Sequence, residues 1–125
     1  MKVFQQVRHL PEFAKDLKKL LKRFKTLEED LENFIDTQLN LYHKLRIDNG
    51  GIVKIQGLPQ REGVEVFKAR KFACRSLKGK GVQSGIRIIY AFRAKEDFVD
   101  LIEIYYKGDQ ENEDRERITR YLESA

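Results

Sequence analysis

The 125-residue sequence contains one cysteine, two histidines and no tryptophan, and no long run of apolar residues. Cys74 has no partner for an internal disulfide, and one cysteine with two histidines is a poor ligand set for zinc. His9 and His43 are expected at the surface rather than as an acid–base pair. No segment approaches the roughly 18–20 apolar residues of a membrane span, and the N-terminus lacks a signal-peptide layout. These absences predict a cytoplasmic protein that uses no membrane, metal or small-molecule cofactor.

Acidic residues are absent from one long part of the chain. From Lys68 to Lys95 the sequence has nine basic residues and no acidic one, whereas the remainder has 16 basic and 20 acidic residues. Cations without nearby carboxylates repel one another and lower stability, which a surface without an anionic ligand does not require. The basic window therefore predicts a binding surface for an anion, and a nucleic acid fits an extended strip of charge. The alternative is an ordinary solvated sheet face.

Two helices are predicted after a short first strand over residues 2–8. Pro11 suits the first turn of a helix, and apolar residues follow it at helical spacing as far as Phe24. The segment Thr26-Leu-Glu-Glu29 has the pattern of a capping box and starts a second helix, whose apolar stripe runs to Leu45. Because almost no residues separate the two patterns, we expect a tight antiparallel helical hairpin.

Three stronger strand patterns occupy residues 64–73, 85–92 and 98–106, and a final amphipathic helix is expected within residues 109–125. Consecutive strands with short connections pair in antiparallel fashion. The order β-α-α-β-β-β-α therefore predicts one α+β domain over residues 1–125. It would contain an antiparallel sheet of about four strands, with the helical hairpin packed on one face and a C-terminal helix. The other face of the sheet is expected to stay open.

Side chains of a strand alternate between its two faces, which decides where the basic residues point. Lys68 and Arg70 share one face of their strand, opposite the apolar face that should meet the helices. Arg87 in the next strand is expected to project from the same open face. Four further basic residues, in or near the glycine-containing loop between these strands, are expected to contact the nucleic acid: Lys71, Arg75, Lys78 and Lys80.

Three strand segments carry a family resemblance: Phe67-Lys-Ala-Arg70, Ser84-Gly-Ile-Arg-Ile-Ile-Tyr90 and Ile104-Tyr-Tyr-Lys-Gly-Asp109. Together with the element order, they resemble the RelE/ParE superfamily of toxins from bacterial and archaeal toxin–antitoxin systems. The resemblance to RelE-type members implies a ribosome-dependent endoribonuclease that cuts messenger RNA, inhibits translation and is neutralised by a partner antitoxin. ParE-type members share the fold and poison DNA gyrase. A non-catalytic, toxin-like nucleic-acid-binding protein is the third alternative.

The resemblance also assigns positions within the site. Lys68, Arg70 and Arg87 match basic groove residues of the RelE type, and Lys107 lies near a further basic position. The family's catalytic tyrosine or histidine lies beyond the last strand, but here residues 108–114 are acidic and contain no aromatic residue. The sequence therefore matches the family residues that contact RNA better than it matches the family residue that cleaves it.

Cleavage of RNA without a metal requires a base for the 2′-hydroxyl, cations for the transition state and an acid for the leaving 5′-oxygen. Arg70 and Arg87 suit the stabilising role, because a guanidinium binds two phosphate oxygens at once. Lys68 is the candidate base, since neighbouring cations are expected to lower the pKa of its ammonium group. Tyr106 or Lys107 is the candidate acid.

Overall fold

A computed structural model of the protein describes residues 2–124, in which five strands form one mixed sheet in the order β1-β5-β4-β3-β2. Strand β1 (Gln6–His9) runs parallel to β5 (Phe98–Tyr106). Antiparallel pairing joins β5 to β4 (Ile86–Arg93), β4 to β3 (Glu65–Ala69), and β3 to β2 (Ile52–Lys54). The α+β class and the three strong strand patterns are thereby confirmed, except that the first strand ends at Ala69 and not at residue 73.

The prediction of about four strands, all antiparallel, is wrong in two respects. Residues 52–54 form an additional edge strand, because Ile52 to Lys54 pair with β3. The N-terminal strand lies parallel to β5, with Gln6 opposite Phe98. This pairing joins two segments that are far apart in the sequence, so short-range patterns carry little information about it.

The helices are α1 (Pro11–Leu21), α2 (Leu27–Phe34) continuing into the π-helix η1 (Ile35–Lys44), and α3 (Arg115–Ser124). The hairpin and the final helix agree with the sequence prediction, but the second helix widens at Ile35. The N–H of Leu45 donates to the carbonyl of Asn40, five residues earlier, at 3.0 Å. This wider repeat matches the five-residue spacing between the buried side chains of Phe34 and Leu39. No helix within residues 2–124 is long and apolar enough to cross a bilayer.

The predicted capping box at Thr26 is not formed. No side-chain hydrogen bond caps α2. The Thr26 hydroxyl instead donates to the Asp30 carboxylate at 2.7 Å and accepts the N–H of Ser76 at 3.0 Å. A tertiary contact with the loop before β4 has therefore replaced the local cap.

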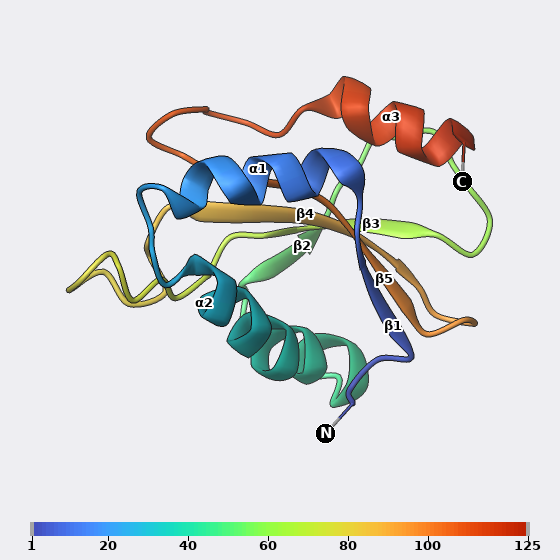
Figure 1. The fold of residues 1–125 in the computed structure, drawn as a ribbon. Helices are drawn as coiled ribbons and strands as arrows, with labels where there is room; N and C mark the ends of the chain where they lie inside the picture. Colours follow the sequence, from blue (N-terminus) through green and yellow to red (C-terminus); the bar gives the residue numbers. More distant parts are fainter. Residues whose placement is uncertain (1, 125) are drawn as a thin grey trace.

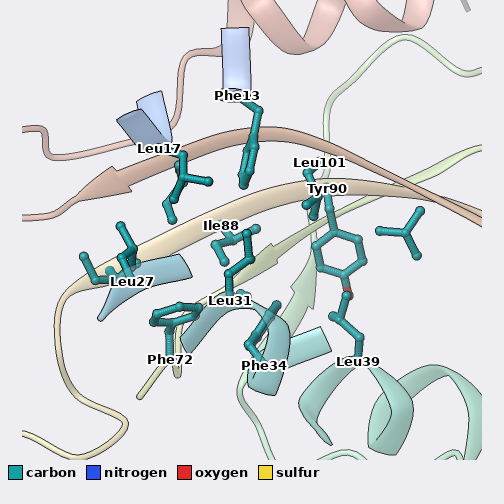
Figure 2. Packing of buried hydrophobic residues seen from close by; sticks show 14 of the residues in the cluster. Phe13, Leu17, Leu27, Leu31, Phe34, Leu39, Phe72, Ile88, Tyr90 and Leu101 are labelled. Atoms are coloured by element: carbon teal, nitrogen blue, oxygen red, sulfur yellow. The ribbon is translucent and has the colours of Figure 1, made fainter. Parts of the chain in front are cut away.

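The main core lies between the helical hairpin and one face of the sheet (Figure 2). As alternation predicted, Phe67 and Ala69 of β3 and Ile86, Ile88 and Tyr90 of β4 are buried there. The helices contribute apolar side chains that are also shown in that figure, among them Phe13, Leu17, Leu27, Leu31, Phe34 and Leu39.

A second, smaller core covers part of the opposite face. Ile118 and Leu122 of α3 pack with Val66, Ile89 and other apolar residues of that face. In Figure 1 the sheet accordingly lies between α3 on one side and α2 with η1 on the other. The prediction of an open second face is therefore wrong for the part under α3, because the alternate residues of β4 are apolar there. The part that carries the first residues of β4 lies outside this cluster.

His43 is half-buried among aromatic rings, in contrast to the predicted surface position. Its Nε2 lies 2.7 Å from the hydroxyl of Tyr90, which is fully buried. Burial lowers the pKa of His43 to about 4 and raises the pKa of Tyr90 well above its ordinary value. The tyrosine therefore keeps its proton and the imidazole is neutral at pH 7, so the contact is a hydrogen bond between two uncharged groups.

Candidate nucleic-acid interface

Arg70 and Arg87 lie next to each other on the α3 side of the sheet. The register pairs Ala69 with Ile88, which places the residue after β3 beside the second residue of β4. Arg87 Nη1 donates to the carbonyl oxygen of Arg70 at 3.0 Å, and Arg70 Nη2 donates to the carbonyl of Gly50 at 3.2 Å. Neither guanidinium forms an ion pair with a carboxylate of residues 2–124, so both charges remain available to an anion. We refer to these two residues as the arginine pair.

Lys68 shares this face but is already paired. Its Nζ donates to Glu113 Oε1 at 2.9 Å, and only 18% of the lysine side chain and 12% of the glutamate side chain are exposed. Burial would lower the pKa of Lys68, but Glu113 and the nearby Tyr105 together outweigh it and raise the pKa above the ordinary value. The predicted lowering of this pKa is therefore wrong. Lys68 is therefore held as a cation, a state that does not suit the predicted role of base.

The two adjacent tyrosines at the end of β5 face opposite ways. Tyr105 pairs across the strands with Arg87 and belongs to the α3 side, whereas the ring of Tyr106 packs against Phe24 at 5.2 Å on the helical-hairpin side. The guanidinium of Arg23 lies 5.3 Å from the centre of the Tyr106 ring. The predicted acid Tyr106 is thus on the wrong face for the arginine pair, because alternation directs Tyr105 there instead.

Tyr105 has an unusual environment for a tyrosine. The residue is 4% exposed, and its buried hydroxyl forms no well-aligned hydrogen bond among residues 2–124, although the Lys68 ammonium lies near enough to act on its pKa. Burial raises the pKa of Tyr105, and the nearby ammonium of Lys68 offsets this only in part. Buried polar groups without a partner are uncommon and call for an explanation. The hydroxyl lies near Lys68, and Tyr105 pairs across the strands with Arg87, so Tyr105 is a better placed functional candidate than Tyr106.

The remaining basic residues are distributed over the loops around this end of the sheet. Lys78 and Lys80 are exposed in the loop that projects at the left of Figure 1, where Gly79 and Gly81 have positive φ angles of 80° and 57°. The N–H of the exposed Lys107 donates to the carbonyl of Gly85 at 2.8 Å. These three lysines could extend a phosphate-binding surface from the arginine pair along the loops.

Two of the predicted RNA-binding residues are engaged with the protein itself. Arg75 Nε donates to Asp30 Oδ1 at 2.9 Å, and its Nη2 contacts the Glu29 carboxylate, which fastens the loop to α2. Lys71 Nζ donates to the carbonyl of Asn49 at 2.8 Å. Contacts of Arg75 and Lys71 with RNA stay predictions, and they would compete with these bonds.

Within residues 2–124, no group of three or more histidine, cysteine or acidic side chains could hold a metal ion. Cys74 is buried, and burial raises the pKa of its thiol. A buried, protonated thiol is a poor nucleophile. Phosphate binding by guanidinium and ammonium groups is the chemistry that the arginine pair and the exposed lysines offer.

Comparisons with known proteins bear on the fold. No protein-family model matches the sequence, and no curated protein matches it. A chain of the crystal structure of the archaeal RelE–RelB complex from Pyrococcus horikoshii superposes with a TM-score of 0.51. The superposition covers 86% of this chain and 98% of that chain at 13% sequence identity. The protein therefore shares the fold of that chain, which agrees with the fold that the sequence resemblance implied.

Proposed function

We propose that this protein is a RelE-like toxin that binds messenger RNA on the ribosome through the arginine pair, cleaves it, and is neutralised by a cognate antitoxin. The observation that supports the proposal most is the adjacency of Arg70 and Arg87, which have no carboxylate partner among residues 2–124. Paired guanidiniums suit phosphodiester oxygens. The similar archaeal chain belongs to a RelE–RelB complex, which favours a protein partner here as well.

In the proposed reaction the ribose 2′-oxygen attacks the neighbouring phosphorus and the 5′-oxygen leaves. Arg70 and Arg87 would stabilise the charge that accumulates on the phosphate oxygens. Tyr105 would donate its proton to the 5′-oxygen, because its raised pKa keeps the hydroxyl protonated at neutral pH. Lys68 would add positive charge, the 2′-hydroxyl proton would pass to solvent, and the ribosome would orient the message.

One observation favours a second function, RNA binding without cleavage. The residue predicted as the base, Lys68, is held as a cation by Glu113. Expression in cells followed by mapping of message ends separates the possibilities. Cuts phased with codons support the endoribonuclease, and growth arrest with intact messages supports binding alone. DNA damage with intact RNA would support a gyrase poison, against which the arginine pair argues.

Arg87→Ala should relieve growth arrest and weaken binding of single-stranded RNA about tenfold, because it removes one bidentate phosphate contact. Lys95→Ala is the matched control. Lys95 belongs to the same basic window but is exposed in the turn between β4 and β5, so its loss should leave toxicity intact. Toxicity of the Arg87 variant at the wild-type level, with a normal melting curve, would remove this arginine from the site.

The two tyrosines provide a separate test of the proposed acid. Tyr105→Phe should slow message cleavage about tenfold in a reconstituted translation reaction, a modest loss for a positioned acid because water can replace it. Tyr106→Phe should cleave at the wild-type rate, since its ring packs on the other face against Phe24. Primer extension on the translated message measures both rates. Equal rates for the two variants would exclude Tyr105 as the acid.

A further inference from the structure

The acidic segment over residues 109–114 folds back onto the basic face and is held there by a buried carboxylate. Glu103 of β5 is 2% exposed. It accepts hydrogen bonds from the side chain of Gln110 at 2.8 Å and from the N–H of Asp114 at 2.9 Å. These two bonds anchor Gln110 and Asp114, which lie on either side of Glu113 in the chain. The segment is therefore positioned by the fold and does not simply follow the strand as a free linker.

The bonds to Glu103 determine where the side chain of Glu113 lies. Its carboxylate lies 2.9 Å from Lys68 Nζ and 3.5 Å from Arg115 Nη1. It also lies close enough to Tyr105 to influence the ionisation of the buried hydroxyl. One carboxylate thus contacts two cations and lies near the buried hydroxyl of Tyr105. An RNA phosphate, which has the same charge and accepts the same bonds, would suit this space.

We propose that Glu113 is an internal phosphate mimic, which closes the Lys68–Tyr105 half of the site until RNA displaces it. The inference rests on the proposed RNA binding and adds its regulation. In the closed form only the arginine pair and the loop lysines are open to RNA. Displacement of Glu113 frees Lys68 for a second phosphate and uncovers the hydroxyl of Tyr105. The Tyr105 hydroxyl, which forms no well-aligned hydrogen bond among residues 2–124, would then donate to the phosphodiester.

The carboxylate of Glu111 offers a matched control. It belongs to the same segment and carries the same charge, but it is exposed and forms no hydrogen bond or ion pair with residues 2–124. Removing the charge of Glu111 changes the general electrostatics of the surface. Removing the charge of Glu113 changes the same electrostatics and also frees Lys68. Any difference between the two variants therefore reports the masking contact.

The test is fluorescence anisotropy of the full chain with a labelled 12-nucleotide RNA that carries 2′-O-methyl groups and cannot be cut. Glu113→Gln should bind this RNA about fivefold more tightly than the wild type. The slope of log affinity against log salt should steepen by about 0.7, the value for one added phosphate contact on a single strand. Glu111→Gln should change the affinity less than about twofold and leave the slope unchanged. In a Lys68→Met background, Glu113→Gln should give no gain.

The outcomes separate the masking from the proposed function. Equal affinities and slopes for Glu113→Gln and Glu111→Gln, with clear RNA binding by both, would overturn the masking alone. Absence of binding in every variant, Glu113→Gln included, would overturn the proposed RNA binding and the masking with it. If Glu113→Gln does not fold, Glu113→Asp replaces it. The shorter side chain withdraws the carboxylate from Lys68, so about a twofold gain is expected and no gain would refute the proposal.

Discussion

Asp100→Ala should lower the free energy of unfolding by about 3 kcal/mol, because it removes the shared acceptor of a buried polar network. The carboxylate of Asp100 is fully buried and accepts from Arg8 Nε at 2.5 Å and Arg8 Nη2 at 2.7 Å. It also accepts from Arg93 Nε at 3.4 Å and from the Tyr121 hydroxyl. Although burial would raise its pKa, the bonds from Arg8 and Tyr121 hold the pKa of Asp100 below the ordinary value.

Thermal unfolding measures this effect, and a loss of about 3 kcal/mol corresponds to a fall in Tm of about 10 °C for a domain of this size. Asp36→Ala is the control, since Asp36 is exposed on η1 and its removal should change stability by less than about 0.5 kcal/mol. A variant of Asp100 that melts within a few degrees of the wild type would show that solvent already satisfies Arg8, Arg93 and Tyr121.

This network also explains how the α3 side of the sheet is held together. Arg8 belongs to β1, Arg93 to β4, Asp100 to β5 and Tyr121 to α3, so one carboxylate joins three strands and a helix. The ends of β4 and β5 that carry Arg87 and Tyr105 lie farther along the same strands. We therefore expect Asp100→Ala to weaken RNA binding only in proportion to the fraction unfolded.

Much of the fold could be predicted from the sequence, because the apolar patterns of the main strands and helices are strong and local. Alternation in β3 and β4 placed Phe67 and Ile88 in the main core correctly. The parallel pairing of β1 could not be read in the same way. Nor could the irregularity in β4–β5 pairing between Ile89 and Tyr90, where Ile89 faces Glu103 but Tyr90 faces Leu101. Such a shift changes which residues of β5 share a face with Arg87.

The candidate site was predictable only in part, for an electrostatic reason. The basic window and strand alternation led correctly to the neighbouring positions of Arg70 and Arg87. The state of Lys68 depends on Glu113, which lies 45 positions later in the chain and reaches it through the bonds of Glu103. A window without acidic residues in sequence is therefore not a surface without acidic residues in space. The alternation of β5 was the available signal for preferring Tyr105 over Tyr106.

The stability of the protein should decrease between pH 6.5 and pH 4 because of His43. In the folded state burial lowers the pKa of His43 from 6.5 to about 4, and the cations Arg46 and Lys44 act in the same direction while Glu65 opposes them. The unfolded chain therefore binds a proton at this site at a higher pH than the folded chain. The stabilisation from neutral His43 is complete above the pKa of His43 in the unfolded chain. It declines as the pH falls toward the pKa of His43 in the folded protein.

The lowered pKa of His43 corresponds to a loss of about 3 kcal/mol in the free energy of unfolding on acidification. We expect a loss of about 2 kcal/mol, because water reaches part of the ring. Urea unfolding at pH 7 and pH 5 would follow the decline. His43→Gln keeps an acceptor for the Tyr90 hydroxyl but cannot take up a proton, so its stability should change much less over this range. The comparison depends on the pH slope and not on the absolute stability of the variant. A slope in His43→Gln as steep as in the wild type would assign the acid sensitivity to other groups.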